Sequence, residues 1–196
     1  MRGRILEAAT HLFARKGLDG TSLQEVAEAV GVRRPSLLWH FGSKDELHAA
    51  VLDALLARWN DALPRLMHAA SREDRFDALL DETISFFAAD PDRARLLLRE
   101  ALDRPDAMRL LLARYVEPWM SLVTDAIRRG QTAGALRAEV DPESYVLMVI
   151  HLVVGNAATV GTVVPAGRAS GLPRRIVREI KRVARASLMP EPPRRT

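Results

Sequence analysis

Hydrophobic residues recur every three or four positions along most of this chain, the spacing that places them on one face of an α-helix. Strictly alternating hydrophobic and polar runs, which are typical of half-buried strands, are absent from the sequence. The pattern therefore predicts an all-α protein. The positions at which the pattern is interrupted predict about nine helices.

The first clear helix boundary is at Ser22, which is followed three residues later by Glu25. This S-x-x-E spacing is that of a capping box, in which each of the two side chains accepts a hydrogen bond from the other residue's backbone N–H. A helix is therefore expected to begin at Leu23. It is short, because Gly31 follows as a residue that can adopt the left-handed conformation that ends a helix.

A second short helix is expected directly afterwards, between residues 33 and 41. Pro35 suits the first turn of a helix, because its fixed φ and missing N–H cost little there. Gly42 is expected to end this helix, and Ser43 with Glu46 repeats the capping-box spacing at the start of a third one. Two short helices joined by a tight turn form a helix-turn-helix, whose second helix reads the major groove of DNA.

Basic and polar side chains lie at the start of this second helix. Arg33 and Arg34 can each bind guanine or a phosphate, and Ser36 follows them. The free N–H groups of the helices that begin at Ser22 and Ser43, with Lys44 beside the second, are expected to bind phosphates. An isolated arginine pair is usually a solvated surface. The caps and glycines that surround this pair favour DNA binding instead.

In this segment the chain resembles the N-terminal domain of the TetR family of transcriptional regulators. The resemblance covers ILEAATHLFARKGLDGTS (Ile5 to Ser22) and continues through LQEVAEAVGV to LLWHFGSKDEL (Leu37 to Leu47). Leu38 departs from the family's usual tyrosine, which removes a phosphate contact, and Arg33 replaces a small residue, which allows a further contact. The resemblance implies that DNA is contacted by Thr21, Arg33, Arg34, Ser36, Trp39, His40 and Lys44.

Charge is distributed unevenly along the chain. Residues 1–48 carry seven basic and six acidic side chains (+1), residues 49–167 carry thirteen and seventeen (−4), and residues 168–196 carry nine and two (+7). The basic C-terminal segment could bind an anionic membrane or nucleic acid. A hydrophobic stripe opposite its arginines favours a packed amphipathic helix with a solvated basic side. The stripe consists of Ile176, Val177, Ile180, Val183, Ala184 and Leu188.

These boundaries divide the chain into a DNA-binding domain at residues 1–48, a helical effector-binding and dimerisation domain at residues 49–189 and a disordered tail at residues 190–196. One long helix at residues 43–64 is expected to link the two domains. Pro118 is expected to kink a later helix and to open space between helices, because it removes a backbone donor. Other helices are expected to begin at Ser71, Asp90-Pro91, Pro105 or Asp106, and Asp141-Pro142, with a stop at Gly130 and Gly134.

Residues 144–167 are a stretch of 24 residues without a formal charge, long enough to cross a bilayer. Its scattered polar residues favour instead a helix buried between the protein's own core and a partner subunit, and no membrane partner is expected. With the helix at residues 172–189 it is expected to form a four-helix homodimer interface, as the resemblance also implies. Residues that permit close helix contact are Gly155, Ala158 and Gly161.

The TetR resemblance also implies a small-molecule effector that binds in the helical domain. Aromatic and methionine side chains are candidates for its pocket, although each is more often ordinary core. His151 and Asn156 are stronger candidates, because a polar group on an apolar helix needs a partner; for His151, a satisfied core histidine is the commoner alternative. The candidate effector-binding residues are Trp59, Phe86, Phe87, Tyr115, Trp119, Met120, His151 and Asn156.

Motifs for catalysis, cofactors or metals are not found in the sequence. Cysteine is absent, the five histidines lack metal-ligand spacing, and neither G-x-S-x-G nor G-x-G-x-x-G occurs. We therefore expect no enzymatic activity, no cofactor and no bound metal. The lack of cysteine and of a signal peptide at the start fits a cytoplasmic protein.

Together these features predict a ligand-responsive, sequence-specific DNA-binding transcriptional regulator. It is expected to be a homodimeric repressor that a small-molecule effector releases from a palindromic operator. The alternative is a helical module that binds a ligand or a protein while its N-terminal domain no longer reads DNA. Leu38 and the near-neutral charge of the DNA-binding domain are the features that keep this alternative open.

Overall fold

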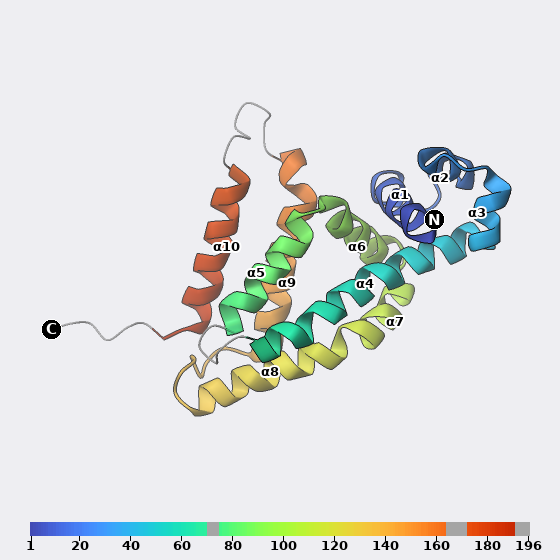
Figure 1. Ribbon diagram of the computed structural model, residues 1–196. Coiled ribbons are helices and arrows are strands. Elements are labelled where there is room, and N and C mark those ends of the chain that lie inside the picture. The colour runs from blue at the N-terminus through green and yellow to red at the C-terminus, as the bar shows by residue number, and fades with distance from the viewer. Residues whose placement is uncertain (70–74, 164–171, 191–196) are drawn as a thin grey trace.

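The structure is a computed structural model that describes residues 1–69, 75–163 and 172–190, and this part of the chain is all α-helical (Figure 1). Its helices are α1 (Arg2–Lys16), α2 (Leu23–Val30), α3 (Arg34–His40), α4 (Lys44–Ala69), α5 (Arg75–Ala88), α6 (Pro91–Asp103), α7 (Pro105–Tyr115), α8 (Glu117–Thr132), α9 (Pro142–Val163) and α10 (Leu172–Leu188). The all-α prediction is confirmed. We call α1 to α3 the head and α5 to α10 the body; α4 extends from one into the other.

The described residues contain one helix more than the nine or so expected, because a single predicted helix is divided in two. The chain leaves α7 and enters α8 at Val116, whose φ of −104° and ψ of −46° interrupt the regular helix. Pro118 lies in the first turn of α8, where its missing N–H costs little. The proline therefore separates two helices instead of kinking one.

One other expected boundary changes, and two expected features lie outside the described residues. The predicted end of the linking helix at Pro64 is wrong, since α4 continues to Ala69. The helix expected to stop at Gly42 does end just before it, with His40 as its last residue and Phe41 in an extended conformation. The N–H of Gly42 donates to the Glu46 carboxylate at 3.0 Å. The cap predicted at Ser71 and the tail from residue 191 are not described.

The head is held together by a small core and by the predicted capping motifs. Phe13 and Leu37 are fully buried between its helices. Ser22 Oγ accepts the N–H of Glu25 at 3.2 Å, and the Glu25 carboxylate accepts the N–H of Ser22 at 2.8 Å. Gly31 has a φ of 73°, a left-handed conformation that favours glycine. The sequence-based prediction of α2 is confirmed at both ends.

Helix α6 lies between the head and the rest of the body, against α1 on one side and α9 on the other. Arg99 of α6 donates to the carbonyl oxygen of Ala14 in α1 at 2.9 Å. Arg95, one turn earlier, donates to the carbonyl oxygen of Ala158 in α9 at 3.0 Å. The head therefore contacts the body through α6 as well as through α4.

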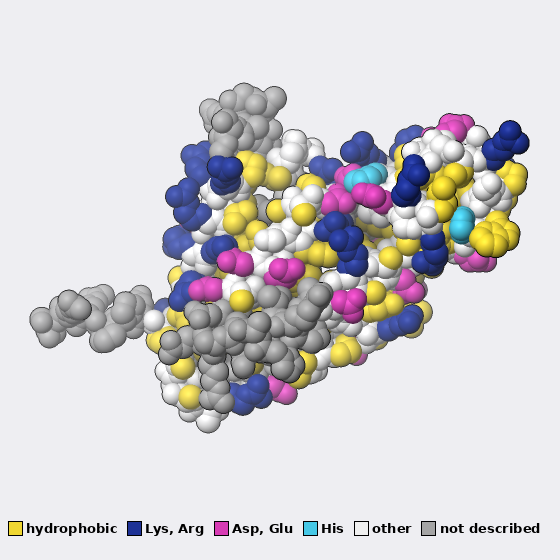
Figure 2. All heavy atoms as spheres, viewed as in Figure 1, with side chains coloured by type: hydrophobic (Ala, Val, Ile, Leu, Met, Phe, Trp, Pro, Cys, Tyr) yellow, Lys and Arg dark blue, Asp and Glu magenta, His cyan; other side chains and the backbone are white. Residues whose placement is uncertain are grey.

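Helix α9 is buried along one side only. By length and composition alone the helix could cross a membrane. Of its most apolar stretch of 18 residues, 22% is buried. Val153 and Val154 lie in the core, whereas Leu147 and Met148 remain about half exposed. The predicted stripe of α10 packs inward, and its basic side faces outward along one edge of the body (Figure 2).

Candidate DNA-binding surface and effector site

Helix α3 presents most of its side chains to solvent. Leu37 is its one buried residue and fixes the helix to the core of the head. Arg33 caps the helix in an extended conformation, and Arg34 begins its first turn. Both arginines are exposed, as is Ser36. The N-terminal end of α3 therefore presents guanidinium and hydroxyl groups that can reach bases or phosphates.

An exposed aromatic side chain extends this surface toward the end of α3. Trp39 is 83% exposed, and its ring meets that of His40 edge to face, with the centroids 5.0 Å apart. These two rings, with Pro35 and Ser36, line a shallow hollow of about 380 Å³. Hydrophobic side chains and a histidine lie side by side at the outer tip of the head (Figure 2). Trp39 is therefore free to contact a partner molecule.

The other three predicted DNA-binding residues are engaged within the head. Thr21 is buried, and its hydroxyl donates to the Gly17 carbonyl at 2.8 Å. Ser22 belongs to the capping box, and Lys44 donates to the Leu18 carbonyl at 2.8 Å. These side chains hold the loop between α1 and α2 against the start of α4.

The capping box carries an unusually acidic carboxyl group. Glu25 accepts a hydrogen bond from Lys16 at 2.5 Å and others from Ser22. The hydrogen bond from Lys16, followed by those from Ser22, lowers the pKa of Glu25 to about 2. The start of α2 is therefore held by an ionised carboxylate at any ordinary pH.

A buried pair of ionisable side chains lies where the head meets the body. His48 of α4 and Glu100 of α6 are each 3% exposed, with His48 Nε2 3.6 Å from a Glu100 oxygen. Burial lowers the pKa of His48 to about 4, and burial raises the pKa of Glu100. The Phe13 ring of α1 contacts His48 edge to face at 4.9 Å. Sequence reasoning missed this pair, since neither residue belongs to a motif.

A second buried carboxylate joins the head to the body more directly. Asp92 of α6 accepts hydrogen bonds from His11 Nδ1 of α1 at 2.8 Å and from Arg95 at 2.6 Å, and it lies 3.3 Å from Arg15 of α1. Burial alone would raise the pKa of Asp92, but the hydrogen bonds from His11 and Arg95 hold it below its usual value. This contact was also not expected from the sequence.

One group of side chains in the described part of the chain has the spacing of metal ligands. Atoms of His11, Asp90 and Asp92 lie within 4.8 Å of one another. Both carboxylates are already engaged, because Arg95 binds Asp92, while Arg93 and the N–H of Asp92 contact Asp90. The group is therefore explained as a contact between helices.

The candidate effector residues fall into two separate groups. The first is an aromatic cluster of four rings from α4, α5 and α8: Trp59, Phe86, Phe87 and Trp119. Trp59 lies 5.3 Å from Phe86, 6.3 Å from Phe87 and 6.2 Å from Trp119, measured between ring centroids. Nearby, the Tyr115 hydroxyl donates to Asp53 at 2.8 Å, and Met120 is half-buried.

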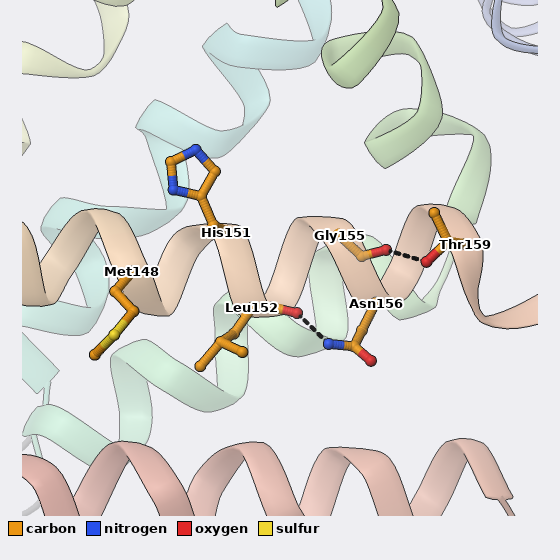
Figure 3. Close-up of a pocket in the computed structure, with 6 residues that line it drawn as sticks. All are labelled: Met148, His151, Leu152, Gly155, Asn156 and Thr159. Atoms are coloured by element: carbon orange, nitrogen blue, oxygen red, sulfur yellow. Dashed lines mark hydrogen bonds between the residues drawn. The ribbon is translucent and has the colours of Figure 1, made fainter. Parts of the chain in front are cut away.

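The second group lies on the outer side of α9. His151 is exposed there and Asn156 is half-buried, and the Asn156 amide donates to the Leu152 carbonyl at 2.7 Å. His151 projects to one side of the helix, and Met148, Leu152 and Asn156 project to the other (Figure 3). A shallow hollow of about 300 Å³ follows this helix, lined by Met148, His151, Leu152, Gly155, Asn156 and Thr159. No described contact joins it to the aromatic cluster.

Comparison with known proteins connects the head and the body to one family. Residues 5–51 match the bacterial regulatory proteins of the tetR family, and residues 73–169 match the tetracyclin repressor-like C-terminal domain. The chain belongs to the TetR family. TetR-family members are DNA-binding transcriptional regulators that respond to ligands and typically act as repressors. This membership supports the regulator hypothesis over a binding module with a degenerate head.

Individual relatives agree with this assignment along most of the chain. The HTH-type transcriptional regulator RutR of Escherichia coli O157:H7 is 30% identical over 158 residues, which cover 74% of this chain and 68% of RutR. The ketosteroid regulator KstR2 of Mycobacterium tuberculosis has the same fold, with a TM-score of 0.76, 18% identity and coverage of 97% and 95% of the two chains. AibR, solved with isovaleryl coenzyme A and operator DNA, gives a TM-score of 0.73 at 20% identity, with 95% and 97% covered.

Proposed function

We propose that this TetR-family protein is a cytoplasmic, homodimeric repressor that binds a palindromic operator and that a small-molecule effector releases. The observation that carries the proposal is the surface of α3, which is anchored by buried Leu37 and leaves two arginines and a tryptophan exposed. A single head offers few contacts. Two heads related by a two-fold axis would read half-sites about one DNA turn apart.

The exposed residues of α3 are proposed to contact DNA directly. Arg33 and Arg34 bind a guanine or a phosphate, and Ser36, Trp39 and His40 contact the groove beside them. Thr21, Ser22 and Lys44 act at the edge of this surface, where the N-termini of α2 and α4 offer backbone N–H groups to phosphates. Leu38, about one-third exposed, lacks the hydroxyl with which tyrosine would bind a phosphate.

The dimer is proposed to form through the last two helices, with α9 as its apolar centre. The outward side of α9 carries the exposed hydrophobic residues Leu147, Met148 and Val163. Helix α10 buries its own stripe within the protomer and faces outward with arginines, so it fits the polar rim of such an interface. A second copy would cover apolar surface that the fold leaves in water.

The effector is proposed to bind in the body and to act through α4 and α6. Both helices contact the head, α4 as a continuous helix and α6 through Asp92 and Arg99. A shift of either helix changes the distance between the two heads and weakens their match to the operator. By linkage, operator DNA must weaken effector binding by the same factor, typically about 5- to 150-fold.

Selection of bound genomic fragments by purified full-length protein, at near-physiological salt, tests the proposal. Recovery of one palindromic motif supports it, and the same experiment with Arg34→Ala should lose that motif. Sedimentation velocity on both proteins should give the same dimer, because α3 lies far from α9. Binding that is weak, indifferent to sequence and unaffected by Arg34→Ala would overturn the proposal.

A further inference from the structure

The aromatic cluster in the body contains one buried polar atom without a partner. Nε1 of Trp119 is enclosed by protein and makes no hydrogen bond, the one side-chain nitrogen or oxygen in the described part of the chain for which this holds. The neighbouring Tyr115 hydroxyl, by contrast, donates to Asp53. A buried donor left unpaired costs free energy, and each such group in a folded protein calls for an explanation, one of which is a bound molecule that accepts its hydrogen bond.

The rings around this atom form an apolar surface of fixed geometry. Trp59 contacts Trp119 edge to face, with an angle of 73° between the ring planes, and contacts Phe86 in the same way at 60°. Trp59 and Phe87 are buried, whereas Phe86 and Trp119 are half-buried and reach the surface. A planar molecule that displaces the half-buried Phe86 ring and leaves Trp119 in place would meet aromatic faces and edges with which it can stack.

Two described charges beside the cluster, Arg93 and Asp53, are already compensated. Arg93 lies over the Phe86 ring at 4.8 Å from its centroid, pairs with Asp90 and donates to the Phe86 carbonyl. Asp53 pairs with Arg114 and accepts the Tyr115 hydroxyl. A ligand with a net charge would therefore be buried among the rings without a counter-ion from these groups, which is strongly unfavourable.

We propose that the effector places a neutral aromatic ring system within this cluster and that a carbonyl-type oxygen on it accepts the hydrogen bond of Trp119 Nε1. This inference rests on the proposed function, which supplies a small-molecule effector. It assigns ligand binding to Trp59, Phe86, Phe87 and Trp119. The hollow along α9 that contains His151 and Asn156 is left to the subunit interface.

Two fluorescent dyes test the proposal on the full-length dimer. Propionyl-dimethylaminonaphthalene is a neutral aromatic ketone, and dimethylaminonaphthalene is the same ring system without the acceptor. Trp119→Phe keeps an aromatic ring and removes the N–H. The lost ring surface affects both dyes alike, so binding of the ketone should weaken roughly five- to tenfold more than binding of the dye without the ketone, the effect of one buried hydrogen bond.

Two further variants make the result interpretable. Trp59→Phe removes ring surface without touching the orphaned donor, so it should weaken both dyes by the same factor. His151→Ala alters the α9 hollow and should change neither dye. If Trp119→Phe does not fold, the preference of the unmodified protein for the ketone over the other dye tests the same hydrogen bond.

Several results would overturn the inference. These are no binding of the ketone, equal binding of the two dyes by the unmodified protein, sensitivity to His151→Ala, or tighter binding of the anionic anilinonaphthalene sulfonate or a quaternary aromatic cation. Each leaves the proposed function standing when a palindromic operator is recovered from genomic fragments. Failure to recover an operator, with the dyes behaving as expected, would instead remove the repressor function and keep the ligand site.

Discussion

The head and the body of this protein are specified in different ways. In the head, contacts between residues three to five apart in the sequence define the helix ends, such as Ser22 with Glu25 and Val32 with Ala27. In the body, the decisive contacts join distant residues, such as Trp59 with Trp119. A DNA-reading surface can thus be recognised from a short motif, whereas a ligand site depends on how whole helices are packed.

The largest effect on stability is expected when the contact between the head and the body at Asp92 is removed. Asp92→Ala removes a buried carboxylate and leaves its partners without a counter-charge, which should lower the free energy of unfolding by about 3 kcal/mol. Chemical denaturation followed by circular dichroism measures this. Asp90→Ala, which removes a more exposed cap of α6, should cost about 1 kcal/mol. Equal effects from the two variants would show that the contact with α1 contributes nothing.

The buried pair of His48 and Glu100, where the head meets the body, should also make the stability depend on pH. The unfolded chain protonates His48 below a pKa of about 6.5, whereas the folded protein does so only near its pKa of about 4. The free energy of unfolding should therefore fall by about 2 kcal/mol between pH 6.5 and pH 4. Glu100, whose pKa is raised, works in the opposite direction.

Denaturation curves at several pH values can separate these two contributions. His48→Gln should flatten the decline in stability below pH 6.5, because the residue that gains a proton on unfolding is gone. Glu100→Gln should make the decline steeper, because it removes the opposing group. A His48→Gln protein with an unchanged slope would place the pH dependence elsewhere in the molecule.

The next test concerns the head alone. Arg34→Ala should reduce affinity for the selected operator at least about tenfold, with an unchanged dimer, because each half-site loses a charged contact. Fluorescence anisotropy with labelled operator measures the loss. Arg129→Ala removes an exposed arginine at the end of α8, remote from α3, and should leave affinity within about twofold. A comparable loss in both variants would mean that total charge matters more than the α3 surface.

The smallest expected effect is at the capping box. Ser22→Ala should lower the free energy of unfolding by about 1 kcal/mol, because the N–H of Glu25 loses its acceptor. Ser85→Ala, at an exposed position within α5, is the matched control and should change stability by less than about 0.5 kcal/mol. Hydrogen exchange should show faster opening of α2 in the first variant, with α9 unaffected.

Sequence reasoning succeeded where a residue's structure depends on its neighbours along the chain. It placed both ends of α2 and the exposed positions of α3, since caps and left-handed glycines have local signatures. It did not find Asp92, whose partner His11 is 81 residues away. It grouped His151 with the aromatic residues, because periodicity identifies a polar residue on an apolar helix without showing which neighbours that helix meets.

Several junctions between helices join an arginine to a main-chain carbonyl. Arg99 binds the oxygen of Ala14, Arg95 that of Ala158, and Arg4 of α1 that of Val30 in α2. Every amino acid supplies this oxygen, so no substitution at the accepting position deletes it. Such links would leave no paired changes in an alignment of relatives. Each such link would be recorded there as a solitary arginine without a co-varying partner, and Arg99 is the one of the three that joins the head to the body.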